Sequence, residues 1–255
     1  MLLAINCNNT NIKFGVVDGD RIIGEWRQHT SAMRTADEHA VWLFQLMAME
    51  GIDPKSITDA IVASVVPNAN FNLRRLCSRY FNCEAMFLGD PNVTYGVKIK
   101  GQGAGADRIC NTIGASLLFP KTPVLVVDFG TSTNFDVVDE EGSYCGGAIA
   151  PGINLSIEAL HNATALLPRI VVEKPQQIIG TNTVACMHTG VFWGYIGLIE
   201  GIVSRIKGEF GRPMKVVSTG GLAPVFEGST TVIDQNAPDI TARGLIEIFK
   251  RSKKK

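Results

Sequence analysis

The sequence predicts an α/β protein made of two similar domains, each of which opens with a meander of antiparallel strands. Short apolar runs closed by turn-forming residues alternate with longer segments whose apolar residues recur at helical spacing. The start of the chain also recurs in part about 122 positions later, a period too long for a solenoid unit. With 255 residues, 45% of them apolar, the chain can form two domains with separate cores.

The first meander is expected where apolar and turn-forming residues alternate at the start of the chain. Asp18-Gly19-Asp20 is typical of a hairpin turn between two of its strands. A strand that follows is closed by Pro67, and helical spacing flanks it on both sides. We therefore expect strands at residues 2–5, 12–17, 21–26 and 60–66, and helices at residues 36–49 and 70–81.

The second meander begins with the stretch around which the rest of the chain is organised. An apolar run over residues 124–127 ends at Asp128, Gly130 and Thr131 follow, and a second apolar run begins almost at once. Glycine permits a left-handed turn and a close approach, so such a hairpin can direct backbone N–H groups and hydroxyls at an anion. This pattern predicts a phosphate-binding hairpin.

The repeat places Asn6 against Asp128 and Val17 against Val138. It implies one domain over residues 1–115 and another over residues 116–255, each with its own hairpin. Two phosphate hairpins across a hinge resemble the arrangement of actin, hexokinase and Hsp70. That resemblance implies duplicated actin-like (ribonuclease H-like) domains with a nucleotide cleft between them.

A glycine-rich stretch over residues 101–105 brings Asp107 and Arg108 to the start of an apolar helix at residues 109–118. Two interpretations remain open from the residues alone. Asp107 can cap the helix, with Arg108 as its ion-pair partner. Alternatively, Asp107 accepts a proton from a substrate hydroxyl while Arg108 holds an anion.

The second half predicts further elements. Residues 146–152 indicate a rigid turn before a helix at residues 155–161. Residues 183–207 indicate a long helical region, expected to be broken, whose small and aromatic residues suit either an interface or the core. A buried strand runs into Gly220 and Gly221, where backbone can approach a ligand, and a last helix is expected at residues 242–250.

Composition excludes several classes of function. Acidic and basic residues balance at 24 each, so no overall field favours nucleic acid or an anionic membrane. Six dispersed cysteines without metal-ligand spacing are expected to be reduced thiols. We find no leader pattern or membrane-length apolar run, and expect a cytoplasmic protein. The basic run at residues 250–255 is expected to be a frayed, solvated tail.

Several motifs in this order resemble the type III pantothenate kinase family over the whole chain. Besides the paired hairpins they are Gly105-Ala106-Asp107-Arg108, Asp128-Phe129-Gly130-Thr131, Gly146-Gly147 through Pro151-Gly152, Thr164-Ala165 through Pro168, and Ser218-Thr219-Gly220-Gly221. The resemblance implies a homodimer that uses ATP, Mg²⁺ and a monovalent cation (K⁺ or NH₄⁺) to phosphorylate the terminal hydroxyl of pantothenate. This reaction is the first step of coenzyme A biosynthesis.

The resemblance also implies a role for each matching residue. Asp107 is the catalytic base, and Asp128 binds the monovalent cation. Pantothenate is bound by Gly105, Ala106, Arg108 and Thr183, the last of these across the dimer. ATP is bound by Asn6, Asn8, Asn9, Thr10, Asn11, Lys13, Gly130, Thr131, Gly220 and Gly221.

Three features depart from the family pattern. Asn6 and Asn8 stand where the family has Asp and Gly, and residues 95–105 form a shorter segment without the family's substrate-contacting tyrosine. A neutral amide is a weaker anchor for hydrated Mg²⁺ than a carboxylate. The sequence therefore leaves open a catalytically impaired homologue with a nucleotide-binding or regulatory role, and a kinase for another hydroxyl substrate.

Overall fold

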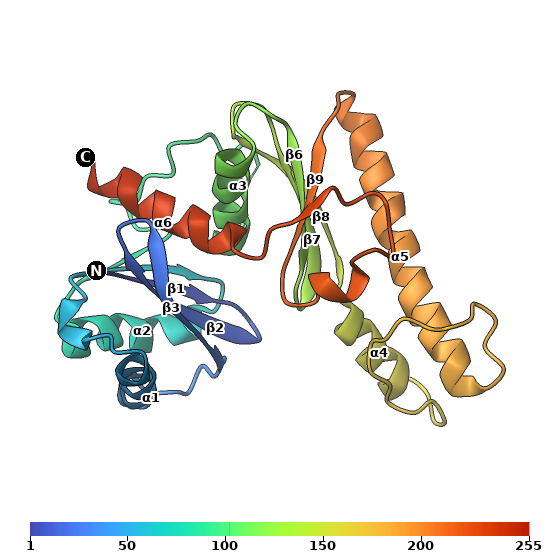
Figure 1. Cartoon of the computed structure of the whole chain (residues 1–255), viewed down its shortest axis with the longest axis horizontal. Coiled ribbons are helices and arrows are strands. Elements are labelled where there is room, and N and C mark those ends of the chain that lie inside the picture. Colours follow the sequence, from blue (N-terminus) through green and yellow to red (C-terminus); the bar gives the residue numbers. More distant parts are fainter. Residues whose placement is uncertain (102, 255) are drawn as a thin grey trace. The chain divides into compact units, whose positions relative to one another are not determined.

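The computed structural model describes residues 1–101 and 103–254 (Figure 1). Gln102, in the glycine-rich stretch, and Lys255, at the end of the basic run, lie outside the described residues. The chain divides into two compact units. Unit 1 draws its described residues from Met1–Lys98, Gln102–Gly114 and Thr241–Lys255, and unit 2 comprises Ile99–Gly101 and Ala115–Ile240.

Unit 1 contains a five-stranded sheet with β1 (Leu2–Cys7) at its centre. β1 pairs antiparallel with β2 (Asn11–Asp18) and parallel with β4 (Asp59–Ser64). β3 (Arg21–His29) and β5 (Ala85–Phe87) form the edges, which gives the order β3-β2-β1-β4-β5. Every residue of β1 is buried, as expected for a strand with neighbours on both sides.

Two helices, α1 (Ala36–Met49) and α2 (Pro67–Tyr80), pack into one core cluster with alternate β1 residues, including Leu3 and Ile5. α1 begins at a capping box: Thr35 Oγ1 accepts the Glu38 N–H (3.3 Å), and the Glu38 carboxylate accepts the Thr35 N–H (2.8 Å). α2 begins at Pro67, earlier than the predicted residue 70, because proline suits the first helical position, where the N–H is unpaired anyway.

The basic end of the chain is helical, so the expectation of a frayed tail was wrong up to residue 253. α6 (Ile240–Lys253) places its last-turn cations beside carboxylates of unit 1. Lys250 pairs with Asp20, and Lys253 Nζ lies 2.7 Å from Asp59 Oδ1. Arg251 Nε donates to Glu247 at 2.8 Å, and Arg251 Nη1 donates to the Tyr95 carbonyl at 2.6 Å. These cations anchor the helix to its own unit.

Unit 2 repeats the sheet of unit 1. β6 (Val124–Phe129) pairs antiparallel with β7 (Ser132–Val138) and parallel with β9 (Lys215–Thr219). β8 (Tyr144–Pro151) and β10 (Gln235–Asn236) form the edges, in the order β10-β9-β6-β7-β8. Read from its other edge, this order matches that of unit 1, strand for strand.

The registers of the two hairpins confirm the internal repeat. Asn6 lies opposite Lys13 in unit 1, and Asp128 lies opposite Asn134 in unit 2. Each is the penultimate residue of the first strand of its sheet. The predicted α/β fold of two similar domains is therefore confirmed, with two five-stranded mixed sheets.

Two helices cover one face of the unit 2 sheet: α4 (Ile153–Asn162) and α5 (Thr183–Phe210). α5 is one unbroken helix of 28 residues, so the break expected within it was wrong. By length and apolar composition alone, α5 is the one described helix that could cross a membrane. Helices from the cores of soluble proteins meet the same criteria, and Phe192, Ile196 and Ile199 of α5 pack in the core of unit 2.

Some elements differ from the sequence-based expectation. Residues 146–152 were expected to be a rigid turn, yet most of them belong to β8, because pairing with β7 outweighs the low strand propensity of glycine. α3 (Ala106–Leu118) begins three residues before the predicted residue 109, so Asp107 lies within its first turn. The short edge strands β5 and β10 were not predicted, since three and two residues carry too little pattern.

A buried histidine makes the folding stability of unit 1 depend on pH. His39 of α1 is 1% exposed; its Nδ1 lies 2.6 Å from Gln28 Oε1, and its ring packs against Phe14. Burial, reinforced by the nearby Arg34, lowers the pKa of His39 from 6.5 to about 4. The folded unit therefore holds this imidazole neutral where the unfolded chain would protonate it.

We expect the free energy of unfolding to be highest above pH 6.5 and to fall by about 3 kcal/mol as the pH drops to 4. In that window the unfolded chain binds a proton that the folded chain excludes. Urea unfolding of wild type and His39→Gln at pH 7.5, 6 and 5 checks this. The variant should lose most of the decrease that wild type shows between pH 7.5 and 5; parallel curves would contradict the assignment to His39.

Candidate active site

The hairpin that joins β6 to β7 holds Asp128 at the carboxyl end of β6. Asp128 lies between Asn134 of β7 and Thr219 of β9, at the end of a parallel strand pair. The turn is closed by the Gly130 N–H, which donates to the Ser132 carbonyl at 3.0 Å. Ser132 Oγ in turn donates to Asn134 Oδ1 at 3.1 Å. The hairpin is therefore ordered by its own hydrogen bonds.

Two glycines from distant parts of unit 2 lie against this hairpin. The Gly152 N–H donates to the Thr131 carbonyl at 3.2 Å, and a Cβ on Gly152 would lie 2.3 Å from that oxygen. Gly220 has φ +94°, and a Cβ there would lie 2.5 Å from the Phe129 carbonyl oxygen and 2.6 Å from Asp128 Oδ1. Only glycine fits at either position. The structure thus brings Asp128, Gly130, Thr131, Gly152 and Gly220 together.

Asp128 supplies the carboxylate of this turn, a ligand type that suits a hard cation. A Cβ on Gly220 would also lie 2.6 Å from the Phe129 backbone nitrogen, so Gly220 itself packs directly against this turn. Carboxylate and carbonyl oxygens are the ligands that such cations prefer. Among the described residues, no three His, Cys, Asp or Glu side chains gather into a metal cluster, so a cation here would rely on Asp128, backbone and ligand oxygens.

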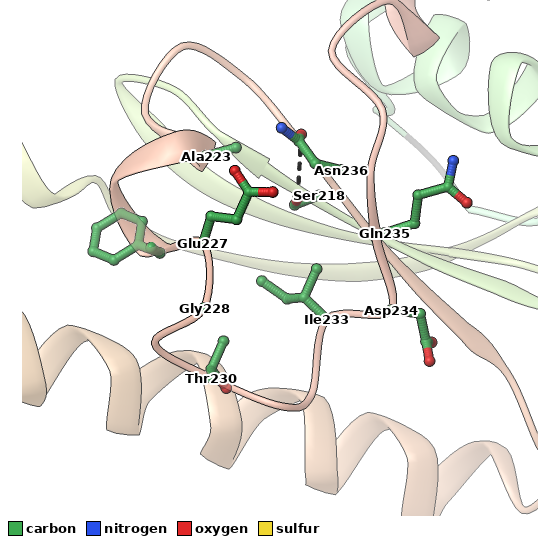
Figure 2. A pocket seen from close by; sticks show the side chains of 10 residues that line it. Ser218, Ala223, Glu227, Gly228, Thr230, Ile233, Asp234, Gln235 and Asn236 are labelled. Atoms are coloured by element: carbon green, nitrogen blue, oxygen red, sulfur yellow. Dashed lines mark hydrogen bonds between the residues drawn. The ribbon is translucent and has the colours of Figure 1, made fainter.

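Gly221 differs from its neighbour. It is exposed, and a Cβ there would meet nothing within 4 Å. Beyond this turn a cavity of about 110 Å³ lies between the 3-10 helix at Ala223–Phe226 and β10 (Figure 2). Ser218 Oγ donates to Asn236 Oδ1 at 3.3 Å along its edge. Sequence reasoning missed Asn236 because it lies on the two-residue strand β10.

The hairpin between β1 and β2 in unit 1 has a different set of polar groups. Thr30 secures it: its Oγ1 donates to the Asn8 carbonyl at 2.6 Å, and its N–H donates to the Thr10 carbonyl at 2.9 Å. The Asn8 N–H donates to the Asn11 carbonyl at 3.1 Å. Asn9, Thr10 and Asn11 are exposed, and Lys13 lies opposite Asn6 on the same face of the sheet.

Two amide oxygens of this hairpin lack a protein partner. Asn6 is 8% exposed, and Oδ1 of Asn6 and Oδ1 of Asn8 are buried without a hydrogen-bond partner in the described part of the chain. A buried acceptor without a donor is costly. Both oxygens could accept hydrogen bonds from the water ligands of a hydrated cation, but neither supplies the charge that Asp128 supplies in unit 2.

Asp107 lies in the first turn of α3, close to the Asn6 hairpin within unit 1. Its Oδ1 accepts the Arg108 N–H at 2.8 Å, and burial raises the pKa of this carboxyl. A Cβ on Gly105 would lie 2.6 Å from Asp107 Oδ1 and 3.5 Å from Val65 Cγ1. The Val65 N–H donates to the Cys7 carbonyl at the end of β1 (3.0 Å). Val65 therefore links the Gly105-Ala106-Asp107-Arg108 motif to the hairpin.

Thr183 is the exposed first residue of α5 and lines a large groove in unit 2. The Asn182 side chain caps the helix by accepting the Ala185 N–H at 2.9 Å. The groove has a volume of about 760 Å³ and runs between α4 and α5. Ile153 and Ser156 of α4 also line it, one and four residues beyond Gly152 at the Asp128 hairpin. α4 thus connects this groove to the hairpin.

Sequence comparisons identify the family. The family described as type III pantothenate kinase matches residues 2–205 of this chain. The chain is 54% identical to the type III pantothenate kinase of Paramagnetospirillum magneticum over 99% of its own length and 98% of the relative's. The chain belongs to the type III pantothenate kinase family. The corresponding Rhodospirillum rubrum protein is 52% identical, with 99% of each chain covered.

Solved structures support the fold of this pantothenate kinase family member. A conserved Baf family protein from Campylobacter jejuni superposes with a TM-score of 0.65 at 17% identity, covering 99% of this chain and all of that one. The activator of 2-hydroxyisocaproyl-CoA dehydratase from Clostridium difficile, solved with bound ADPNP, gives a TM-score of 0.54 at 12% identity, covering 99% and 96%. At such identities the likeness concerns the fold alone.

Tyr95, at the start of the shortened segment 95–105, makes structural contacts within unit 1. Burial raises the pKa of its half-buried phenol, whose oxygen also bonds the backbone at Gly89. The Tyr95 carbonyl accepts from Arg251 Nη1 at 2.6 Å, and a Cβ on Gly96 would lie 3.0 Å from Arg251 Cδ. Tyr95 therefore holds the start of the shortened segment 95–105 against α6.

Adjacent glycines provide a matched test of the Asp128 site. We expect Gly220→Ala to lower the free energy of unfolding by about 2 to 4 kcal/mol, because the new Cβ is strained by the positive φ and overlaps the Phe129 carbonyl. Gly221→Ala should change it by no more than about 0.5 kcal/mol. Urea unfolding of both variants measures this difference, and equal losses would contradict the described packing.

Proposed function

We propose that the chain transfers the γ-phosphoryl group of ATP to the terminal hydroxyl of pantothenate, giving 4'-phosphopantothenate. Membership of the type III pantothenate kinase family is the observation that carries this proposal. Asp107 and its surroundings support it, because a partly buried carboxyl in a first helical turn can accept a proton from a hydroxyl. We place the reaction in the cytoplasm.

In this proposal the residues of unit 1 handle the acceptor. Asp107 takes the proton from the pantothenate hydroxyl as that oxygen attacks the γ-phosphorus. Burial raises the pKa of Asp107, which brings it closer to the pH at which the enzyme works and strengthens it as a base. Gly105, Ala106 and Arg108 hold pantothenate, with the guanidinium of Arg108 suited to its carboxylate or to the transferring group.

ATP is assigned to groups of both hairpins. Thr131, with its hydroxyl, and the exposed Gly130 beside it are assigned to phosphate oxygens. Gly220 and Gly221 are assigned to the adenosine, where the backbone at Gly221 is open to a ligand. Asn6, Asn8, Asn9, Thr10, Asn11 and Lys13 are assigned to the phosphates on the unit 1 side. Asp128 would hold the monovalent cation, K⁺ or NH₄⁺, and Asn6 and Asn8 would hold hydrated Mg²⁺ through water. When bound, these cations neutralise phosphate charge.

We also propose that the enzyme is a homodimer that uses the groove along α5. Unit 2 exposes large apolar side chains on α4, on the segment that follows it and at the start of α5: Leu155, Leu160, Leu166, Val171, Ile178, Ile179 and Val184. Apolar surface of this extent is typical of a protein interface. Thr183 lines the same groove, which supports its assignment to pantothenate bound across the dimer.

Asp107→Asn is expected to lower kcat by about 10²- to 10⁴-fold, because an amide cannot accept the proton. In wild type, the acid limb of kcat/KM against pH should lie above 3.8, the ordinary pKa of aspartate, since burial raises the pKa of Asp107. Phosphopantothenate formation measured with Mg²⁺ and K⁺ checks both. ATP binding and thermal stability serve as controls and should be unchanged; an active variant would remove Asp107 as the base.

A catalytically impaired homologue is the second candidate, and the neutral Asn6 is the observation that favours it. We expect wild type to turn over, and Asn6→Asp to lower the Mg²⁺ concentration for half-maximal rate by about tenfold, or about 1.4 kcal/mol of added attraction. The structure gives the introduced carboxylate the register position that Asp128 has in unit 2.

Steady-state rates over a Mg²⁺ titration, with pantothenate and with other small hydroxyl acceptors, separate the candidates. No product from wild type but product from Asn6→Asp would establish the impaired homologue. Turnover of another acceptor in place of pantothenate would establish a related kinase. The variant Asn92→Asp, at an exposed position of unit 1 outside the residues assigned to ATP and pantothenate, controls for added charge alone.

A further inference from the structure

Two cysteines meet at the end of α2, far along the chain from any group assigned to the reaction. Cys77 lies in the last turn of the helix, and Asn82 follows it with a left-handed φ of 51°. That turn folds the chain back, so that the N–H of Cys83 donates to the Cys77 carbonyl at 3.2 Å. Both side chains lie in one buried cluster, and each thiol shifts the pKa of the other.

We propose that Cys77 and Cys83 form a redox-active dithiol, which closes to a disulfide when the protein meets a low-molecular-weight disulfide such as oxidised glutathione. A disulfide needs its two Cβ atoms close together and facing each other. Here the backbone turn brings the two residues together, and both side chains lie in the same buried cluster. Closure would tie the end of α2 to the segment that enters β5.

The two thiols differ in a way that gives each a role. Cys83 is 8% exposed and Cys77 is fully buried. The interaction with the Cys77 thiol lowers the pKa of Cys83, while the same interaction and burial raise the pKa of Cys77. The more accessible, more acidic thiol is the one that attacks first.

The exchange balances in two steps. The Cys83 thiolate attacks one sulfur of the small disulfide, forms a mixed disulfide and expels one thiolate. The Cys77 thiol then loses its proton to water, attacks the Cys83 sulfur and expels the second thiolate, which takes up a proton. Two protein thiols are oxidised, and the small disulfide is reduced to two thiols.

No other cysteine shares this arrangement in the residues that the structure describes. All six cysteines are free thiols. Cys7 and Cys110 are buried, and burial raises the pKa of both thiols. Cys186 is exposed on α5.

The paired thiols lie at the opposite end of α2 from Val65 and Val66, about 20 Å away for a helix of 14 residues.

Intact mass and peptide mapping of the full chain test the proposal. The reduced protein is incubated with oxidised glutathione, denatured in acid, alkylated and digested with trypsin. Trypsin cleaves after Arg79, between the two cysteines, so a disulfide would join residues 76–79 to residues 80–98 until reductant is added. We expect this linked pair, together with the loss of two of the six alkylation sites.

Two variants serve as controls. Cys186→Ser removes the exposed thiol and should still lose two alkylation sites, whereas Cys83→Ser should retain alkylation at Cys77. The linked peptides of wild type are read directly, so the test does not depend on the folding of Cys83→Ser. Full alkylation of Cys77 and Cys83 in oxidised wild type, or a glutathione adduct on Cys186 alone, would overturn the proposal.

Discussion

The position of the first strand in each sheet is the constraint on which the rest of the structure depends. β1 and β6 are each paired antiparallel on one side and parallel on the other. This arrangement buries both strands and leaves only their last residues at the carboxyl edge, where the turn begins. Asn6 and Asp128 are polar because they stand at this edge, and the apolar residues before them are fixed by packing on both faces.

The two units share the same strand order but carry different polar groups at their hairpins. Both units use the same strand order, yet the edge position carries a carboxylate in unit 2 and an amide in unit 1. In unit 2, Gly152 and Gly220 pack directly against the hairpin, and they fit there only because glycine has no Cβ. In unit 1 the hairpin is secured by Thr30, and two amide oxygens are left for an outside partner. The two hairpins therefore provide different environments to a phosphate or cation.

Sequence patterns predicted most of the fold because the central strands and amphipathic helices carry strong periodicity. The repeat of Asn6 and Asp128 could be found from spacing alone, and strand register confirms it. The strand β10 and its residue Asn236 could not be predicted, because a strand of two residues is too short to show a periodic pattern. The strand over Gly146 and Gly147 was missed because its pairing with β7 is not visible locally. The close fit of Gly152 against Thr131 could not be predicted either, because it depends on how separate segments of unit 2 pack together.

The position of α6 bears on how the protein is made. Unit 1 begins at the first residue of the chain, yet it includes α6, whose Lys250 and Lys253 pair with Asp20 and Asp59. The residues of unit 2 are almost all synthesised before that helix. During translation, unit 1 therefore has to wait for α6, which is made after almost all of unit 2, while unit 2 can finish folding ahead of it.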